Sequence, residues 1–193
     1  FRKFKDLVQN KVPNQPEELR VSDITDIELN GKNAYLALVT DAYSKQIMGF
    51  HVATNMKASL SIDALKMALK NRKYPNRKLI HHSDRGFHYC WPEYVKILQD
   101  NDILISMTEQ YDPYENALAE RINKTMKYEF GLNQTIPNKT MAQKMVRRAV
   151  KIYNTLRPHD SLKGKTPVSV HLNADMPYKS YRRNKEIIYL NLN

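Results

Sequence analysis

The order of strand and helix patterns along the 193 residues predicts an α/β protein built on a mixed five-stranded sheet. Three strand patterns come first, and the turn sequence NGKN between the first two favours antiparallel pairing. Two more strand patterns follow, each reached through a helical pattern, as is usual for parallel strands. We therefore expect three antiparallel strands plus two parallel strands, with helices on both faces of the sheet.

Residues 21–53 supply the three antiparallel strands. VSDITDIEL (21–29) alternates apolar and polar side chains, and AYLALVTDAYSKQIMGFHVA (34–53) contains the next two strands. Residues 1–20 carry Pro13 and Pro16 among polar residues. We expect these first residues to form an N-terminal arm or linker.

Helix and strand patterns alternate in the next part of the chain. Ser59–Asn71 places its apolar residues on one face and ends before Pro75. The short run KLIHH (78–82) is the fourth strand. Pro92 suits the first position of a helix that continues to residue 101, and ILISM (103–107) is the fifth strand.

Two longer helices complete the pattern. One begins near Glu115, and apolar residues recur in it at every fourth position. The other begins at Thr140, which forms a capping-box pattern with Gln143, and runs to about residue 156. Its apolar face is expected to consist of Met141, Met145, Ala149, Ile152 and Tyr153.

Charge is distributed unevenly along the chain. The net charge is +11, yet residues 1–120 contain 16 basic and 16 acidic residues, whereas residues 121–193 contain 15 basic and 4 acidic residues. We expect the core to span residues 21–157 and to be followed by a basic C-terminal extension over residues 158–193. A basic half of this kind is typical of proteins that bind nucleic acid. The alternative is a basic surface that only faces solvent.

Composition limits the class of protein further. With 41% apolar residues and no apolar run near the ~20 residues of a membrane span, the sequence predicts one globular domain and no membrane partner. The single cysteine, Cys90, allows no internal disulfide and no zinc spacing, so we expect it to be buried in a reducing compartment. Because the chain opens on Phe1 rather than Met, we expect it to be part of a longer protein.

Three carboxylates occupy positions where an ordinary surface charge is unexpected. Asp23 lies inside the first strand on the side of Val21 and Ile27, which is expected to be buried. Asp84 ends the fourth strand, and Glu120 lies near the start of a helix, away from its apolar stripe. Singly, Asp84 is explained as a turn residue, Asp23 as half of an ion pair and Glu120 as a solvated residue. Together they predict a divalent metal site, because clustered carboxylates must be paired, protonated or metal-bound.

The motifs around these carboxylates lead to a more specific prediction. VSDITDI, HHSDRGFHY and YDPYENALAERIN, with 35 residues between Asp84 and Glu120, resemble the DDE signature of retroviral integrases and insertion-sequence transposases. More narrowly, TEQYDPYENALAERIN followed by YNTLRPHDSLKGKTPVSVH resembles the second-frame catalytic domain of insertion-sequence transposases. The resemblance covers Leu19 to Val170 and implies a ribonuclease H-like fold.

By this resemblance, Asp23, Asp84 and Glu120 are the catalytic and metal-binding residues. It implies two Mg²⁺ or Mn²⁺ ions in the presence of DNA, and cleavage and joining of DNA strands by in-line displacement at phosphorus. The attacking group is then water or a DNA 3′-hydroxyl. The implied partners are the DNA of the element ends and of the target, together with further copies of the chain assembled on that DNA. The implied location is the bacterial cytoplasm, on the nucleoid when DNA is bound.

Basic residues supply the expected DNA contacts. Lys124 and Lys127 follow Glu120 on one helix face, and Asn116 lies one turn before it. They resemble the integrase residues that hold terminal phosphates; the alternatives are ion pairs with Glu120 or simple solvation. Arg157 is a further candidate for binding phosphate. The last helix adds a basic stripe, which consists of Lys144, Arg147, Arg148 and Lys151.

The chain also departs from the usual pattern of the family it resembles. Arg20 and Asp26 stand where many relatives carry Trp and Tyr, and Glu115 opens a stretch that is usually Asp-Asn-Ala. These departures leave the preference for particular DNA ends open. Asp26 is a carboxylate in the same motif that we do not expect to bind the metal, because alternation along the strand places it on the opposite side from Asp23.

Two other functions and several lesser residues complete the expectations. A ribonuclease H-like nuclease that cuts RNA or branched DNA is disfavoured by the 35-residue spacing and by the glutamate on the last helix of the triad. An inactive, domesticated DNA-binding module is disfavoured by the intact carboxylates. We expect structural roles for His81, His82 and His159, and a core position for Trp91.

Overall fold

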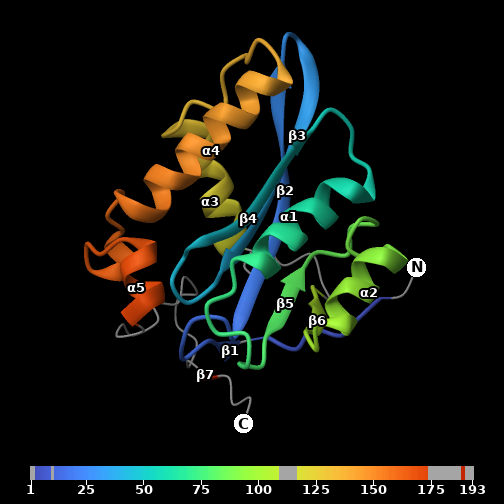
Figure 1. The fold of residues 1–193 in the computed structure, drawn as a ribbon, viewed down its shortest axis with the longest axis vertical. Coiled ribbons are helices and arrows are strands. Elements are labelled where there is room, and N and C mark those ends of the chain that lie inside the picture. Colours follow the sequence, from blue (N-terminus) through green and yellow to red (C-terminus); the bar gives the residue numbers. More distant parts are fainter. Residues whose placement is uncertain (1–2, 10, 109–116, 174–187, 190–193) are drawn as a thin grey trace.

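A five-stranded sheet with the order β4-β3-β2-β5-β6 forms the centre of the molecule (Figure 1). The computed structural model describes residues 3–9, 11–108, 117–173 and 188–189. β2, β3 and β4 pair antiparallel, and β5 and β6 continue the sheet in parallel from β2. The strands are β2 (Leu19–Leu29), β3 (Lys32–Asp41), β4 (Ile47–Ala53), β5 (Ile80–Ser83) and β6 (Leu104–Met107). The predicted mixed sheet of three antiparallel and two parallel strands is confirmed.

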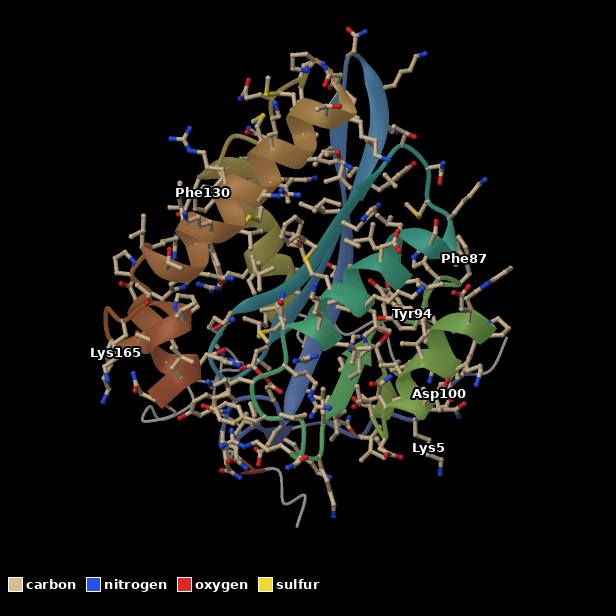
Figure 2. The ribbon with its side chains drawn as sticks, viewed as in Figure 1. Lys5, Phe87, Tyr94, Asp100, Phe130 and Lys165 are labelled. Atoms are coloured by element: carbon tan, nitrogen blue, oxygen red, sulfur yellow. The ribbon has the colours of Figure 1, made fainter. Side chains whose placement is uncertain are left out.

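Helices cover both faces of this sheet, as predicted (Figure 1). α1 (Ala58–Lys70) and α2 (Pro92–Asp100) pack on one face, and α3 (Ala117–Tyr128) and α4 (Lys139–Thr155) pack on the other. Side chains fill the layers between helices and sheet (Figure 2). A 3-10 helix (Asp160–Leu162) and α5 (Pro167–Asn173) follow α4. β1 (Lys11–Val12) and β7 (Ile188–Tyr189) form a separate parallel pair.

The start of α4 differs from the expected capping box. The helix begins after Asn138, whose side chain accepts a hydrogen bond from the Met141 N–H at 2.9 Å. The proposed box of Thr140 and Gln143 is therefore wrong, because the capping residue comes two positions earlier. Met141 is also 43% exposed rather than buried.

Gly49 of β4 allows α1 to lie in close contact with the sheet. A Cβ atom at this position would overlap the Ala64 carbonyl oxygen and would lie 2.7 Å from the Ala68 backbone nitrogen. Any larger residue at position 49 would therefore push α1 away from β4.

The described residues at both ends of the predicted core pack against it. β2 begins at Leu19, two residues before its expected start, and residues 17–20 are buried. Beyond α4, Leu162 and Val170 form a small buried cluster with Tyr43. The division of the chain at residues 20 and 157 stays a prediction.

No helix in the described part of the chain combines the length and the apolar character that crossing a membrane would need.

Candidate active site

Asp23 lies in β2, and Asp84 directly follows β5, the neighbouring parallel strand. The pairing of β2 with β5 ends with Val21 opposite His82, and the same register continued by two residues brings Asp23 opposite Asp84. β5 ends at Ser83, so Asp84 stands just beyond the carboxyl end of its strand. Ligands of open α/β sheets bind at this edge.

Glu120 adds a third carboxylate from α3, a helix that packs along β2. Its side chain is exposed, as expected from its position away from the apolar stripe. Burial, together with the negative charges of Asp84 and Glu120, raises the pKa of Asp23 to about 7. Such a rise is expected where carboxylates share one region. The structure therefore places Asp84 and Glu120 close enough to Asp23 for their charges to act on it.

Asn123, one turn after Glu120, holds the Asp23 carboxylate. Its Nδ2 donates a hydrogen bond to Asp23 Oδ2 at 2.8 Å. Its own Oδ1 is buried and has no hydrogen-bond partner among the described residues, which is costly for an amide. The sequence analysis did not identify Asn123. The available signal was an amide on the buried side of α3, between Ile122 and Met126.

A tight turn at Gly86 fixes the Asp84 carboxylate. Its Oδ1 accepts a hydrogen bond from the Gly86 N–H at 2.8 Å. A Cβ atom at Gly86 would lie 2.9 Å from both Asp84 Oδ1 and His88 Nε2, so the His88 ring stands beside this carboxylate. Burial lowers the pKa of His88, and the charge of Asp84 opposes that effect. His88 was also missed in the sequence.

The donor atoms of this region suit a divalent cation with oxygen ligands. Three mutually repelling carboxylates without a thiolate favour Mg²⁺ or Mn²⁺ over zinc. Within the described ranges, however, no group of three His, Cys, Asp or Glu side chains is arranged to hold a metal ion. Asp84 is engaged by Gly86, and Asp23 by Asn123. An ionised carboxylate has about four acceptor sites, so Asp23 and Asp84 can keep these donors while they hold a cation.

The basic residues of α3 take different positions. Lys124 is exposed, and Asn116 lies outside the described residues. Lys127 pairs with Asp26 rather than with Glu120, at 3.0 Å between Nζ and Oδ1. The hydrogen bond from Lys127 lowers the pKa of Asp26. The pairing of β2 with β5 ends before this point, so the long lysine side chain can reach Asp26 from α3.

The basic stripe of α4 lies on its solvent side. All four of its members, Lys144, Arg147, Arg148 and Lys151, are exposed. Arg157 is held differently, because its Nε and Nη2 atoms each donate to the Glu129 carboxylate at 2.6 Å. A phosphate would have to compete with Glu129 for this guanidinium.

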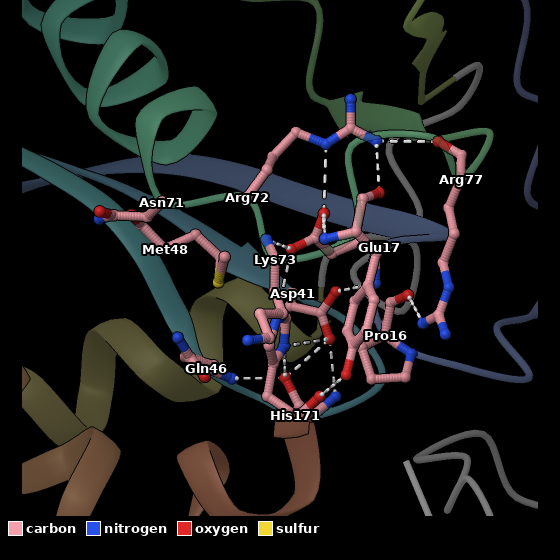
Figure 3. Close-up of polar contacts among 12 residues, drawn as sticks. Pro16, Glu17, Asp41, Gln46, Met48, Asn71, Arg72, Lys73, Arg77 and His171 are labelled. Atoms are coloured by element: carbon pink, nitrogen blue, oxygen red, sulfur yellow. Dashed lines mark hydrogen bonds and ion pairs between the residues drawn. The ribbon is translucent and has the colours of Figure 1, made fainter. Parts of the chain in front are cut away.

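A second group of charges is buried where the N-terminal segment, the end of β3 and α5 meet (Figure 3). The Glu17 carboxylate accepts from Lys73 N–H at 2.6 Å and lies 3.2 Å from His171 Nε2. Burial raises the pKa of Glu17, but the hydrogen bonds from His171 and Lys73 lower it to about 2. Burial lowers the pKa of His171, but Asp41 and Glu17 raise it to about 9. Opposite charges are thus paired, and the group fastens α5 to the core.

The remaining expectations have mixed outcomes. His81, His82 and His159 are buried and bond or pack within the core, in agreement with structural roles. Cys90 is buried, as expected. Trp91 is 40% exposed, so its expected core position is wrong.

Two family models match this chain. A model described as integrase core domain matches residues 13–113, and a second model with the same description matches residues 101–167. A putative transposase for insertion sequence element IS986/IS6110 from Mycobacterium tuberculosis is 37% identical over 129 residues, which are 64% of this chain and 46% of the relative. The IS600 31 kDa protein of Shigella sonnei is 32% identical over 164 residues, which are 84% of this chain and 60% of the relative. The chain thus spans about half the length of the curated relatives that it matches.

Solved structures show the same fold. The HTLV-2 integrase catalytic core domain in complex with magnesium superposes with a TM-score of 0.65 at 17% identity, covering 83% of this chain and 99% of that one. A chain of the simian T-cell lymphotropic virus intasome superposes with a TM-score of 0.70 at 19% identity, covering 96% of this chain and 64% of that one. The fold is therefore the ribonuclease H-like fold of integrase catalytic cores, as the sequence resemblance implied. The chain belongs to the integrase core domain family, the family of its insertion-sequence transposase relatives.

Proposed function

We propose that this chain is the catalytic core of a transposase that cleaves and joins DNA strands, with Asp23, Asp84 and Glu120 as its catalytic carboxylates. One observation carries the proposal. Asp23 lies in β2 and Asp84 directly follows the neighbouring parallel strand β5, and the charges of Asp84 and Glu120 help to raise the pKa of Asp23. An ionisable group whose pKa is raised by burial and by neighbouring carboxylates, at the edge of an α/β sheet, is typical of a catalytic site.

The same three residues would hold Mg²⁺ or Mn²⁺, and we expect two ions when DNA is bound. When bound, the metal supplies Lewis-acid stabilisation of the oxygens around the reacting phosphorus. Asn123 orients Asp23, and the turn at Gly86 fixes the position of Asp84. The attacking group is water during cleavage and a DNA 3′-hydroxyl during joining.

DNA binding is assigned to the basic part of the chain. The exposed stripe of α4 and Lys124 offer cations to the phosphate backbone, and Lys127 and Arg157 are available once they leave their carboxylate partners. Asn116 remains a candidate on sequence grounds. Both element ends and target DNA are expected partners. One structural relative is described as an intasome, and we infer that this chain also assembles as a homo-oligomer on DNA, associated with the nucleoid of a bacterial cytoplasm.

The test compares Glu120→Gln with Asp26→Asn. Both changes neutralise a carboxylate near α3, but only Glu120 belongs to the proposed triad. Glu120→Gln should lower Mn²⁺-dependent strand transfer on labelled DNA ends by orders of magnitude. Its DNA affinity should stay level or rise, because repulsion of phosphate is reduced. Asp26→Asn should leave strand transfer nearly unchanged.

Other results would assign other functions. Near-normal strand transfer by Glu120→Gln would show that the third carboxylate lies elsewhere, and Glu115 would be tested next. Cleavage without joining by the unmodified protein would indicate a nuclease. Tight DNA binding without either reaction would indicate an inactive DNA-binding module.

A further inference from the structure

An open groove of about 530 Å³ lies between the start of α1, the start of α2 and the loop that follows Asp84. Its lining includes three large apolar side chains, Met56, Phe87 and Trp91, which are 39%, 46% and 40% exposed. Figure 2 shows Phe87 next to the start of α1. The volume falls in the range of about 300 to 1,000 Å³ that is usual for small-ligand sites. The groove is therefore large enough for a nucleotide-sized group.

The identity of the residues at this groove is unusual for their local structure. Trp91 occupies the N-cap of α2 and Lys57 the N-cap of α1, and neither side chain makes a capping hydrogen bond. Ser, Thr, Asp or Asn would stabilise the helix at either position, because its side chain accepts a hydrogen bond from a free N–H of the first turn. A tryptophan that caps nothing and remains 40% exposed gives up local stability, which is expected when its ring serves a contact with another molecule.

The groove adjoins the candidate active site. The Phe87 ring lies 4.4 Å from the His88 ring, measured between centroids, and His88 Nε2 stands beside the Asp84 carboxylate. A strand whose phosphate is at Asp84 would therefore have a neighbouring base within reach of Phe87. Lys57 lies at the start of α1, whose first turn has no acidic residue. The acidic residues that line the groove have partners of their own, because Glu93 pairs with Lys66 at 3.7 Å and Asp63 with His51 at 3.6 Å.

We propose that this groove binds one unpaired nucleobase of the DNA strand that is being processed, stacked on Trp91 and Phe87. The inference rests on the proposed function and adds to it a base-binding site. Exposed aromatic rings stack on bases of any sequence, but only on bases whose faces are open. A paired base inside a duplex offers no open face, so the groove selects a frayed or extruded base next to the reacting phosphate.

The sole tryptophan of the chain makes the proposal directly measurable. Emission of Trp91 would be followed while the protein is titrated with a short thymidine oligonucleotide. The comparison probe has the same length and charge, but its nucleotides are abasic. We expect saturable quenching by the thymidine oligonucleotide and no quenching by the abasic one.

Variants separate stacking from general binding. Phe87→Ala and Trp91→Ala should weaken binding of the labelled thymidine oligonucleotide by about fivefold to a hundredfold, which corresponds to the loss of one stacked base. Trp91→Phe should retain most of the affinity, because an aromatic ring remains. Tyr128→Ala is the matched control, since Tyr128 is exposed on α3 and lies outside the groove. Equal losses in Tyr128→Ala and Trp91→Ala would overturn the proposal.

Failure of the groove and failure of the proposed function can be told apart. Asp84-dependent strand transfer without any quenching of Trp91 would overturn base binding in the groove and support the proposed transposase activity. Quenching of Trp91 without strand transfer would support base binding in the groove and overturn the proposed transposase activity. A change of Trp91 emission with protein concentration alone would assign the groove to a second copy of the chain and overturn base binding.

Discussion

At the scale of single residues, the hydrogen bond between Asn123 and Asp23 joins α3 to the central strand of the sheet. One carboxylate oxygen of Asp23 is thereby fixed, while its pKa is already raised by burial and by the neighbouring charges. The amide therefore sets the direction of the carboxylate without adding charge to a region that already carries three negative groups.

Asn123→Ala should lower Mn²⁺-dependent strand transfer by about 10- to 100-fold, the usual effect of removing a partner that orients a metal-binding residue. The expected rise in the Mn²⁺ concentration needed for half-maximal rate distinguishes this effect from loss of fold. Asn133→Ala is the matched control, because Asn133 is exposed on the loop after α3. Equal rates for Asn123→Ala and the unmodified protein would contradict the role assigned to Asn123.

The sequence predicted the carboxylates better than their partners. Asp23 and Asp84 could be identified because each interrupts or ends an apolar strand pattern, which is a local signal. Asn123 and His88 gave no such signal, since an amide or an imidazole near a motif has many local explanations. The pairing of Lys127 with Asp26 depends on how α3 crosses β2, and no spacing along the chain encodes that crossing.

At the scale of elements, α4 has two separable properties, its cap and its charge. Asn138→Ala should lower the free energy of unfolding by about 1 kcal/mol, because the Met141 N–H loses its acceptor. Thr140→Ala should have a much smaller effect, since Thr140 lies inside the helix rather than at its cap. Urea unfolding of the two variants measures both values. A larger loss of stability in Thr140→Ala than in Asn138→Ala would show that Thr140 caps the helix, as the sequence pattern predicted.

The basic stripe of α4 should contribute directly to DNA binding. Log K falls with log salt by about 0.9 for each duplex phosphate neutralised, so changing all four stripe residues to Gln should flatten the slope by about 2 to 4 units. The control changes four exposed lysines elsewhere to Gln, so it removes the same amount of positive charge from the side of the molecule where α1 and α2 lie. These lysines are Lys70, Lys73, Lys78 and Lys96. Equal slopes of log K against log salt in the two variants would show that DNA binding depends only on the net charge of the protein and not on the location of the stripe.

Element order was readable from the sequence, whereas element ends were not. Periodicity identified all five strands of the sheet, because alternation and short apolar runs are local properties. The start of α4 was misplaced because Asn138 and Thr140 are both good caps, and only the fold decides which side chain meets a free N–H. Trp91 was misplaced because an apolar residue at a helix start is usually buried, and here it is not.

At the scale of the whole molecule, the buried charges around His171 link stability to pH. The pKa of His171 is about 9 in the folded protein against about 6.5 in an unfolded chain, so its contribution is complete below pH 6.5 and is lost as the pH rises through 9. Glu17 behaves in the opposite sense, because its contribution is present above about pH 4.5 and is lost as the pH falls through 2.

His171→Gln should therefore be less stable than the unmodified protein at pH 6, by up to about 3 kcal/mol, and this difference should shrink toward pH 9.5. Taking the difference removes the contributions of Asp23 and Lys45, whose pKa values near 7 are common to both proteins. Urea unfolding across this pH range provides the measurement, with His51→Gln on β4 as the control outside the cluster. A difference that stays constant with pH would show that His171 is not charged in the fold.

This buried group was beyond sequence reasoning. Glu17 fell in the expected arm and His171 in the expected extension, and neither position carries a periodic signal. Their contact exists only because four parts of the fold converge. These are the start of β2, the end of β3, the loop after α1 and α5. The strands of the sheet could be predicted from patterns within a few residues. The contact between Glu17 and His171, which holds α5 against the core, could not.

The contact between Glu17 and His171 spans 154 residues of sequence. A ribosome that adds about 5 to 20 residues per second needs roughly 8 to 30 s to make that span. During this interval the segments that carry Glu17 and Asp41 have already been synthesised, while the histidine that pairs with both does not yet exist. The nascent chain must therefore leave this corner open to water or to a chaperone until α5 arrives, so this part of the fold cannot close before His171 has been synthesised.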